Sequence, residues 1–192
     1  MVKIKKISLR EVGLKTKLKF KLSKKYSKIK YLLRVKHFRG RDVHSPFMYG
    51  IVRKALMNRR GKHLIINAKL YDFLGQCGYI SSSRKRICRI FTYLELEDYM
   101  KIDSYNNSNG LIVLENSQEF EALKKCVEEI RNSGAFAFIT LGNIYADDKA
   151  NLLWNKIIFE LDCVAVDLYH EGLIFVNESL CKQDYKMKFQ VL

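Results

Sequence analysis

Short apolar runs alternate with amphipathic helical patterns in the second half of this 192-residue chain, and this alternation constrains the fold more than any other feature. Residues 111–114 (Leu-Ile-Val-Leu) contain no polar side chain, which is typical of a strand buried on both faces of a sheet. Residues 135–141, which are apolar except for Thr140, predict a second buried strand. Helical patterns follow at 116–133 and 146–159, so the segment predicts parallel strands joined through helices.

The C-terminal part predicts a reversal of strand direction. Strand patterns at 163–169 and 173–176 are separated by residues 170–172, a connection short enough for a hairpin. Residues 185–189 alternate apolar side chains with lysines, which indicates a final edge strand protected against further pairing. The predicted fold class is therefore α/β, with a mostly parallel sheet and a C-terminal antiparallel hairpin.

The first half of the chain is expected to be helical, apart from one strand at 99–102. Ser45 is a favourable N-cap, and Pro46 fits the first position of a helix that runs to about Asn58. Further helical patterns, including a basic amphipathic one that follows an N-terminal arm of residues 1–17, lie at 23–37, 67–77 and 83–93.

Positive charge is concentrated at the N-terminus. Residues 1–62 contain 21 Lys and Arg against two acidic residues, a net charge of +19. Residues 63–192 contain 14 against 18, a net charge of −4. We therefore expect a basic arm with its helices over 1–62 and an α/β domain over 63–192, with residues 42–62 packed into the same compact unit.

The composition argues against several classes of protein. The cysteines are five, an odd number, and include no C-x-x-C pair, so we expect buried, reduced thiols rather than a disulfide scaffold. No run approaches the roughly 20 apolar residues that span a bilayer, and the Lys-rich N-terminus lacks the apolar region of a secretory signal. These features favour a soluble cytoplasmic protein without a metal centre.

Several short stretches, in order along the chain, resemble a known family. They are His44-Ser45-Pro46-Phe47 at the start of a helix after a basic arm, Trp154, residues 164–176 (VAVDLYHEGLIFV) and residues 182–189 (KQDYKMKF). Together they are similar to class I S-adenosylmethionine-dependent methyltransferase-like proteins of the Bacteroidetes type. The resemblance covers roughly residues 26–58 and 111–189, and it implies a Rossmann-like sheet that ends in a hairpin.

The half of such a sheet that would hold the cofactor has no counterpart in this sequence. The resemblance implies a Gly-rich turn after the first strand and an acidic residue at the end of the second, because the cofactor needs close backbone approach and an acceptor for its ribose hydroxyls. Residues 94–110 leave room for one strand and a loop, and they contain no Gly-x-Gly. We therefore expect a truncated, degenerate methyltransferase-like sheet without a cofactor.

Glu115 is the one candidate cofactor-binding residue that remains when the sequence is compared with this family. It follows the run 111–114, where the resemblance implies an aspartate, and a carboxylate at the carboxyl end of a strand is available as an acid or base. A carboxylate near the start of a helix is the simpler interpretation. His44, in the family-like motif, is expected to support the turn that follows it. No catalytic residue is assigned.

Other polar clusters have ordinary structural explanations. Asp147 and Asp148 point about 100° apart on a helix, which favours helix capping over joint metal binding. His170 and Glu171 are expected in a solvated turn. The serines at 81–83 either cap the next helix or hold a phosphate at its basic start.

The charge of the N-terminal section suggests an anionic partner. Aromatic side chains interleave with its lysines and arginines, an arrangement suited to stacking on nucleic-acid bases or to shallow insertion into an anionic membrane surface. A solvated basic helix without a ligand is the alternative. The candidate anion-binding residues are Lys24, Lys25, Lys28, Lys30, Arg34, Lys36, Arg39 and Arg41.

Two functional hypotheses follow. In the first, the chain is a degenerate methyltransferase-like protein, a pseudoenzyme that binds an anionic or protein partner. In the second, it is an active S-adenosylmethionine-dependent methyltransferase whose cofactor site is atypical or is completed by another copy of the chain. The absent half-sheet is also expected to leave an apolar edge near 111–114, which either a helix from 67–93 covers or a second chain pairs with to form a homo-oligomer.

Overall fold

The computed structural model describes residues 43–57, 66–106, 108–115 and 119–188, together with Ile29, His37 and Phe38. The chain divides into two units, Met1–Arg34 and Val35–Leu192, and the helices and strands described below belong to the second. The predicted arm and most of the helix predicted at 23–37 lie outside the described residues. His37 belongs to a strand, so the predicted end of that helix is wrong.

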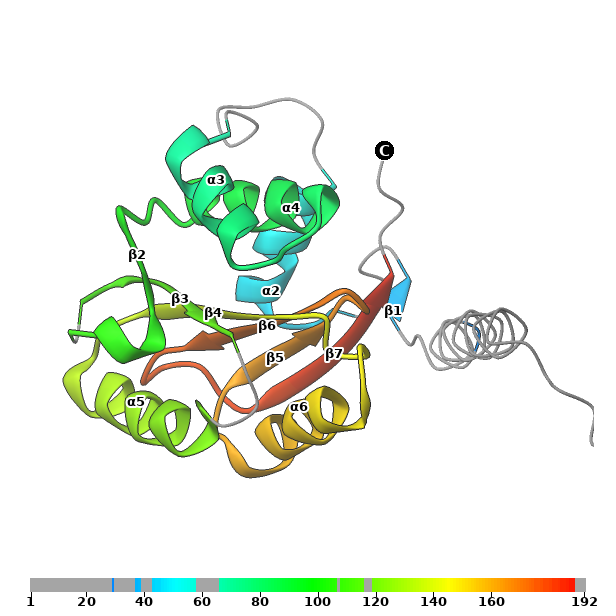
Figure 1. Ribbon diagram of the computed structural model, residues 1–192. Coiled ribbons are helices and arrows are strands. Elements are labelled where there is room, and N and C mark those ends of the chain that lie inside the picture. The colour runs from blue at the N-terminus through cyan, green and yellow to red at the C-terminus, as the bar shows by residue number, and fades with distance from the viewer. Residues whose placement is uncertain are drawn as a thin grey trace, which may run out of the picture. The chain divides into compact units, whose positions relative to one another are not determined.

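Within the described residues, seven strands form one mixed sheet: β1 (His37–Phe38), β2 (Asp98–Lys101), β3 (Gly110–Leu114), β4 (Ala137–Gly142), β5 (Val164–Asp167), β6 (Glu171–Val176) and β7 (Gln183–Lys188). Their order across the sheet is β1-β7-β5-β6-β4-β3-β2 (Figure 1). Neighbouring strands are parallel, except that β6 is antiparallel to β4 and β5 on either side of it. The predicted α/β class and the mostly parallel sheet with an antiparallel hairpin are confirmed.

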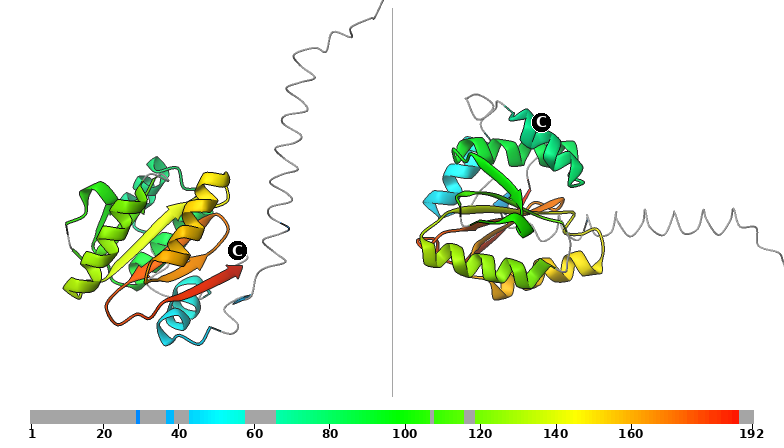
Figure 2. Two further views of the ribbon diagram at one scale, coloured as in Figure 1. Left: turned by 90° about the horizontal axis from the view of Figure 1, so that it is seen from below. Right: turned by 60° about the vertical axis from the view of Figure 1, so that its left-hand side comes forward.

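Helices cover both faces of this sheet (Figures 1 and 2). One face carries α2 (Pro46–Gly50), its π-helical continuation η1 (Ile51–Leu56), α3 (Ala68–Gln76) and α4 (Ser81–Tyr93). The other face carries α5 (Phe120–Ser133) and α6 (Asp148–Glu160), and a short 3-10 helix, η3 (Ile102–Ser104), follows β2. In the part of the chain that the structure describes, no helix is long and apolar enough to cross a membrane.

Strand β3 explains why the sheet has a helical layer on each side. Leu111 and Val113 belong to the hydrophobic cluster that includes α4, whereas Ile112 and Leu114 belong to the cluster that includes α5 and α6. All four side chains are buried. Alternate residues of a strand point to opposite faces, so a run without polar positions supplies two cores. The prediction of a doubly buried strand is confirmed.

Side-chain caps fix the starts of three helices. Ser45 accepts a hydrogen bond from the first turn of α2 at 3.4 Å, and Pro46 is the first residue of that helix. Asn67 caps α3 at 3.0 Å and Asp147 caps α6 at 2.8 Å. These starts agree with the sequence patterns to within two residues. Residues 116–118, at the start of the helix predicted over 116–133, lie outside the described residues.

Two predictions about the edges of the sheet are wrong. Strand β3 is not an edge, because β2 pairs with it in parallel, with Asp98 opposite Gly110. Strand β7 is not an edge either, because β1 pairs with it in parallel, with His37 opposite Met187. At the other side the described sheet ends in β2, whose residues are half-buried or exposed.

Candidate functional site

Polar side chains gather where the parallel strands end. Strands β3, β4 and β5 are followed at this edge by Glu115, Asn143 and Leu168, and antiparallel β6 begins here with Glu171 opposite Gly142. Open α/β sheets bind their ligands at the carboxyl edge, so a functional site is expected there first. The carboxylates of Glu115, Asp167 and Glu171 lie at this edge, and each has a partner among the described residues.

Glu115 is an exposed carboxylate held by a lysine from the neighbouring strand. The Nζ of Lys101, at the end of β2, lies 2.9 Å from the Oε1 of Glu115. The hydrogen bond from Lys101 lowers the pKa of Glu115, and the thiol of Cys77 adds a second hydrogen bond. Burial, with that contact to Glu115, raises the pKa of Cys77 to about 11. The structure therefore places Glu115 as an ionised partner of Lys101, with Cys77 a protonated thiol beside it.

Glu171 is fully buried, which corrects the expectation of a solvated turn residue. The guanidinium of Arg86 on α4 donates to both of its carboxylate oxygens, through Nε and, at 2.9 Å, through Nη2. The hydroxyl of Ser83 donates to Oε2 at 2.5 Å. This bidentate ion pair joins α4 to the start of β6, because a buried carboxylate needs its charge and its acceptors satisfied. Ser83 thus binds a carboxylate of this chain, and the helix cap position falls on Ile80.

Asp167, at the end of β5, is a second buried carboxylate. Tyr145 donates its hydroxyl to Oδ2 at 2.6 Å, the backbone N–H of Tyr169 donates to Oδ1 at 2.9 Å, and the Nζ of Lys186 lies 3.3 Å from Oδ2. Burial raises the pKa of Asp167 and outweighs these three partners, each of which lowers it. These contacts fix the turn between β5 and β6, where Tyr169 has a positive φ of 72°.

The raised pKa of Asp167 predicts the direction of a pH effect. Between its ordinary pKa of 3.8 and the raised value, the folded protein binds more protons at this residue than the unfolded chain does. The contribution of Asp167 to the free energy of unfolding therefore falls as pH rises through this window. Urea unfolding of wild type and Asp167→Asn at a series of pH values measures it. The wild-type value minus the variant value should decline from about pH 4 upward, and a difference that grows with pH would contradict the assignment.

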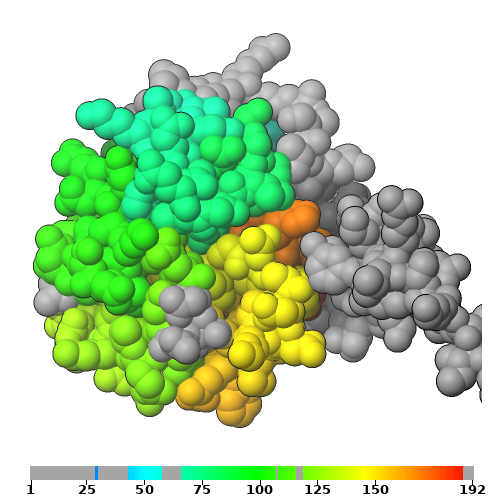
Figure 3. All heavy atoms as spheres, viewed as in Figure 1, coloured from blue at the N-terminus to red at the C-terminus, as the bar shows by residue number. Residues whose placement is uncertain are grey.

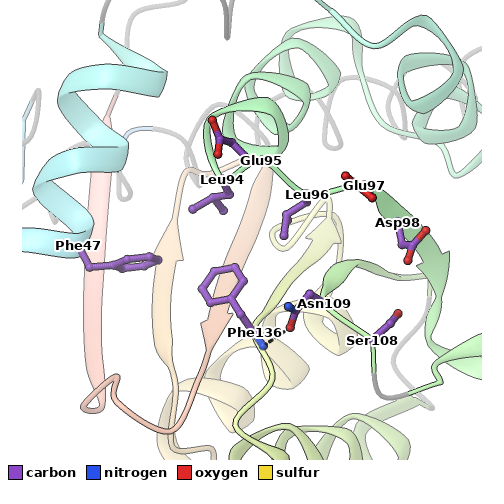
Figure 4. Close-up of a pocket in the computed structure, with 9 residues that line it drawn as sticks. All are labelled: Phe47, Leu94, Glu95, Leu96, Glu97, Asp98, Ser108, Asn109 and Phe136. Atoms are coloured by element: carbon purple, nitrogen blue, oxygen red, sulfur yellow. Dashed lines mark hydrogen bonds between the residues drawn. The ribbon is translucent and has the colours of Figure 1, made fainter.

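The family-like motif lies at the opposite, amino edge of the sheet. His44 is exposed, Ser45 and Pro46 start α2, and Phe47 packs edge-to-face against Phe136 and Phe175 with ring centroids 5.9 and 5.4 Å away. Two pockets flank Phe47. One, of about 520 Å³, lies toward β2 and is shown in Figure 4. The other, of about 440 Å³, contains all four motif residues and lies toward β5 and β7.

The remaining candidates take structural positions or cannot be placed. Asp147 caps α6, as the favoured interpretation predicts, and Asp148 is the first residue of that helix. In the described ranges, no group of three or more His, Cys, Asp or Glu side chains is arranged to hold a metal ion. The eight candidate anion-binding residues at 24–41 lie outside the described residues.

The structure separates charge in a way that the sequence does not reveal. The described residues of the helical layer above the sheet, 43–57 and 66–93, contain seven basic residues and one acid, Asp72, a net charge of +6. The opposite layer, residues 119–133 and 147–162, contains five basic and eight acidic residues, a net charge of −3. The two layers form separate regions of the surface (Figure 3). The basic residues are Arg53, Lys54, Lys69, Arg84, Lys85, Arg86 and Arg89.

We refer to the solvent side of α2, η1, α3 and α4 as the basic face. Arg53, Lys54, Lys69 and Lys85 are exposed on it. Tyr49 is 51% exposed, with the guanidinium carbon of Arg53 lying 6.0 Å from its ring centroid. Sequence reasoning missed this face because the acidic residues of α5, α6, the strands and the loops cancel its charge when residues 63–192 are counted together.

Comparisons of this chain with protein-family models, with curated proteins and with solved structures gave no match.

Proposed function

We propose that this chain is a binding protein for polyanions, built on a partial methyltransferase-like sheet and without methyl-transfer activity. The observation that carries the proposal is that the sheet separates a helical layer of net charge +6, in which Arg86 is neutralised by the buried Glu171, from a layer of net charge −3. A face of one sign attracts a polymer of the opposite sign, and each phosphate it neutralises releases counterions. The +19 net charge of residues 1–62 has the same sign as this face.

The strand order supports the methyltransferase-like part of the proposal. Strand β6 lies between β4 and β5 and runs antiparallel to both, which is the terminal hairpin that the sequence resemblance implies. Strands β4, β3 and β2 continue the sheet in parallel. The connection from β2 to β3, residues 102–109, is shorter than the dozen or so residues of a crossover through a helix. We infer that the strands which would complete the cofactor half are lost at this point.

The pairing of carboxylates at the carboxyl edge supports the loss of transfer activity. A ligand that used Glu115 or Glu171 as a hydroxyl acceptor would have to displace Lys101 or Arg86. Removing Arg86 from a fully buried carboxylate is costly. The turn after β2 is the 3-10 helix η3, which contains no glycine.

Two lysine pairs provide a matched test of the basic face. Lys54→Gln/Lys85→Gln removes two exposed charges from the basic face, and Lys124→Gln/Lys149→Gln removes two exposed charges from the opposite layer. Binding of a fluorescent single-stranded oligonucleotide and of phosphatidylserine vesicles is measured over a salt series. We expect the first variant to weaken binding of one of these probes by about tenfold and to reduce the slope of log affinity against log salt by about 2. The second variant should stay within about twofold of wild type.

Equal losses in both variants would show that only net charge matters and would contradict a binding face. Binding of neither probe by the full chain would remove the proposed function altogether. Comparing the oligonucleotide with the vesicles decides which class of polyanion is preferred.

Calorimetry with S-adenosylmethionine and with its demethylated product tests the loss of the cofactor site. We expect no heat of binding from either compound. Low-micromolar binding would instead favour an active transferase with an atypical or oligomer-completed site, and turnover of a methyl acceptor would establish it.

A further inference from the structure

The pocket of about 520 Å³ at the amino edge of the sheet combines an apolar interior with a rim of carboxylates. Its walls come from α2, from residues 94–97 between α4 and β2, from Asp98 at the start of β2, from residues 108–109 before β3, and from Phe136 before β4 (Figure 4). It lies at the opposite end of the strands from Glu115 and Glu171, and α2 and β2 bring its walls together from distant parts of the sequence. Its volume falls within the range of pockets that bind small molecules.

The interior of the pocket is aromatic and aliphatic. Phe47, Leu94, Leu96 and Phe136 line it, and all four are half-buried. The rings of Phe47 and Phe136 are 5.9 Å apart at an interplanar angle of 62°. Phe47 also packs against the buried Phe175, so its ring is held in place from below. An apolar body of a ligand would find an apolar surface here.

The rim is acidic although the chain as a whole carries +15. Glu95, Glu97 and Asp98 come from one wall, and Figure 4 shows Glu97 and Asp98 at the β2 end of the pocket, whereas the side chain of Glu95 points away from Phe47 and Phe136. Glu97 and Asp98 are exposed, and neither forms an ion pair with any cation in the described part of the chain. Ser108 and Asn109 lie beside this wall, because Gly110 pairs with Asp98, and the Oδ1 of Asn109 accepts the backbone N–H of Phe136 at 2.8 Å. The charge of the pocket is thus negative and comes from one wall.

From this geometry we propose that the pocket binds a small organic cation with an aromatic body, an arylalkylamine in chemical class. The carboxylates favour a positive charge at one end of the pocket, and the interior with its two phenylalanine rings favours an aromatic body attached to that charge. A neutral aromatic compound would contact only the apolar interior, and a metal ion would contact only the carboxylates of the rim. An arylalkylamine would contact both. This proposal is independent of the polyanion-binding face, because it concerns the other sign of charge and other residues.

The test uses the full chain and a pair of probes that differ in charge. 2-Phenylethylamine is a cation near neutral pH, and 2-phenylethanol is a neutral molecule of nearly the same shape. Ligand-observed NMR titration should give an affinity about tenfold higher for the amine. Raising sodium chloride from about 50 to about 500 mM should remove most of this advantage in the wild-type protein, since the rim is open to screening.

Two variants and a matched control locate the effect. Glu97→Gln/Asp98→Asn should reduce the affinity for the amine to that for the alcohol, about tenfold. The matched control Glu128→Gln/Glu160→Gln removes two exposed acids from α5 and α6 and should leave the affinity within about twofold. Phe136→Leu keeps an apolar side chain but removes one ring face, and it should weaken the amine about threefold.

Equal affinity of the wild-type protein for the amine and the alcohol would overturn the proposal, as would an amine affinity that salt does not change. These two measurements need no variant, so a misfolded substitution cannot obscure the result. Unchanged amine binding in a folded Glu97→Gln/Asp98→Asn variant would overturn it as well.

Discussion

Replacing Arg86 with methionine is expected to lower the free energy of unfolding by about 3–5 kcal/mol. The substitution keeps much of the side-chain volume but leaves the carboxylate of Glu171, which is fully buried, without its cation. Ser83 remains as a donor to one oxygen only. An ionised carboxylate without a counter-charge is among the costliest groups to bury, so the loss should far exceed that of an ordinary surface substitution. Urea unfolding followed by circular dichroism measures the change.

Two further variants separate the ion pair from general effects on α4. Arg53→Met removes an exposed arginine from the same helical layer and should change stability by less than about 0.5 kcal/mol. Arg86→Met/Glu171→Leu replaces both partners by apolar groups and should recover most of the loss. If the double variant is as unstable as Arg86→Met alone, the carboxylate is not the cause.

The second large effect is expected from a single methyl group at Gly172. A Cβ at this position of β6 would lie within 3.0 Å of three ring atoms of Trp154 on α6. Trp154 is 1% exposed and has no room to withdraw. Overpacking of this kind forces both the ring and the strand to shift, and Gly172→Ala should lower the free energy of unfolding by about 3 kcal/mol.

The chain has one tryptophan, so its fluorescence follows the same site during unfolding. Gly142→Ala, on the neighbouring strand, brings its Cβ to 3.3 Å from Tyr79, a tight but adjustable contact, and should cost about 1 kcal/mol. In a double-mutant cycle, Gly172→Ala should cost less when Trp154 is replaced by phenylalanine. Additive effects would mean that the ring is not what the methyl group meets.

Local patterns predicted the elements of this fold well. The doubly buried strand β3, the hairpin β5-β6 and the starts of α2, α3 and α6 each depend on side-chain periodicity or on a cap within a few residues. Each of these patterns lies within one continuous segment of the sequence, so it can be recognised without knowledge of the tertiary structure.

The edges of the sheet and the buried carboxylates depend on partners far away in sequence. Glu171 and Arg86 are 85 residues apart, and neither carries a local sign of the other. In the sequence, Glu171 follows His170 in the short connection between two strand patterns, and this context predicts a solvated residue. The pairing of β1 with β7 likewise joins residues 37–38 to 187–188. No periodicity encodes such contacts.

The candidate surfaces were the hardest features to predict. The motif residue Phe47 lines the acidic-rimmed pocket, but residues 94–98 and Phe136 reach it only through the strand order β4-β3-β2. The basic face was hidden for a related reason, because counting charge along the chain mixes residues that the sheet places on opposite sides.

The position of β6 has a consequence for how this chain acquires its structure. In the described sheet, the block β2-β3-β4 and the block β5-β7 touch through β6, which hydrogen-bonds to both. In a nascent polypeptide, the side of β4 that pairs with β6 stays without a partner until residues 171–176 are available, and β7 is synthesised later still. Assembly of the sheet is therefore a late event in synthesis. A chain that is released before β6 has paired with β4 and β5 should be prone to aggregation through the unpaired strand β4.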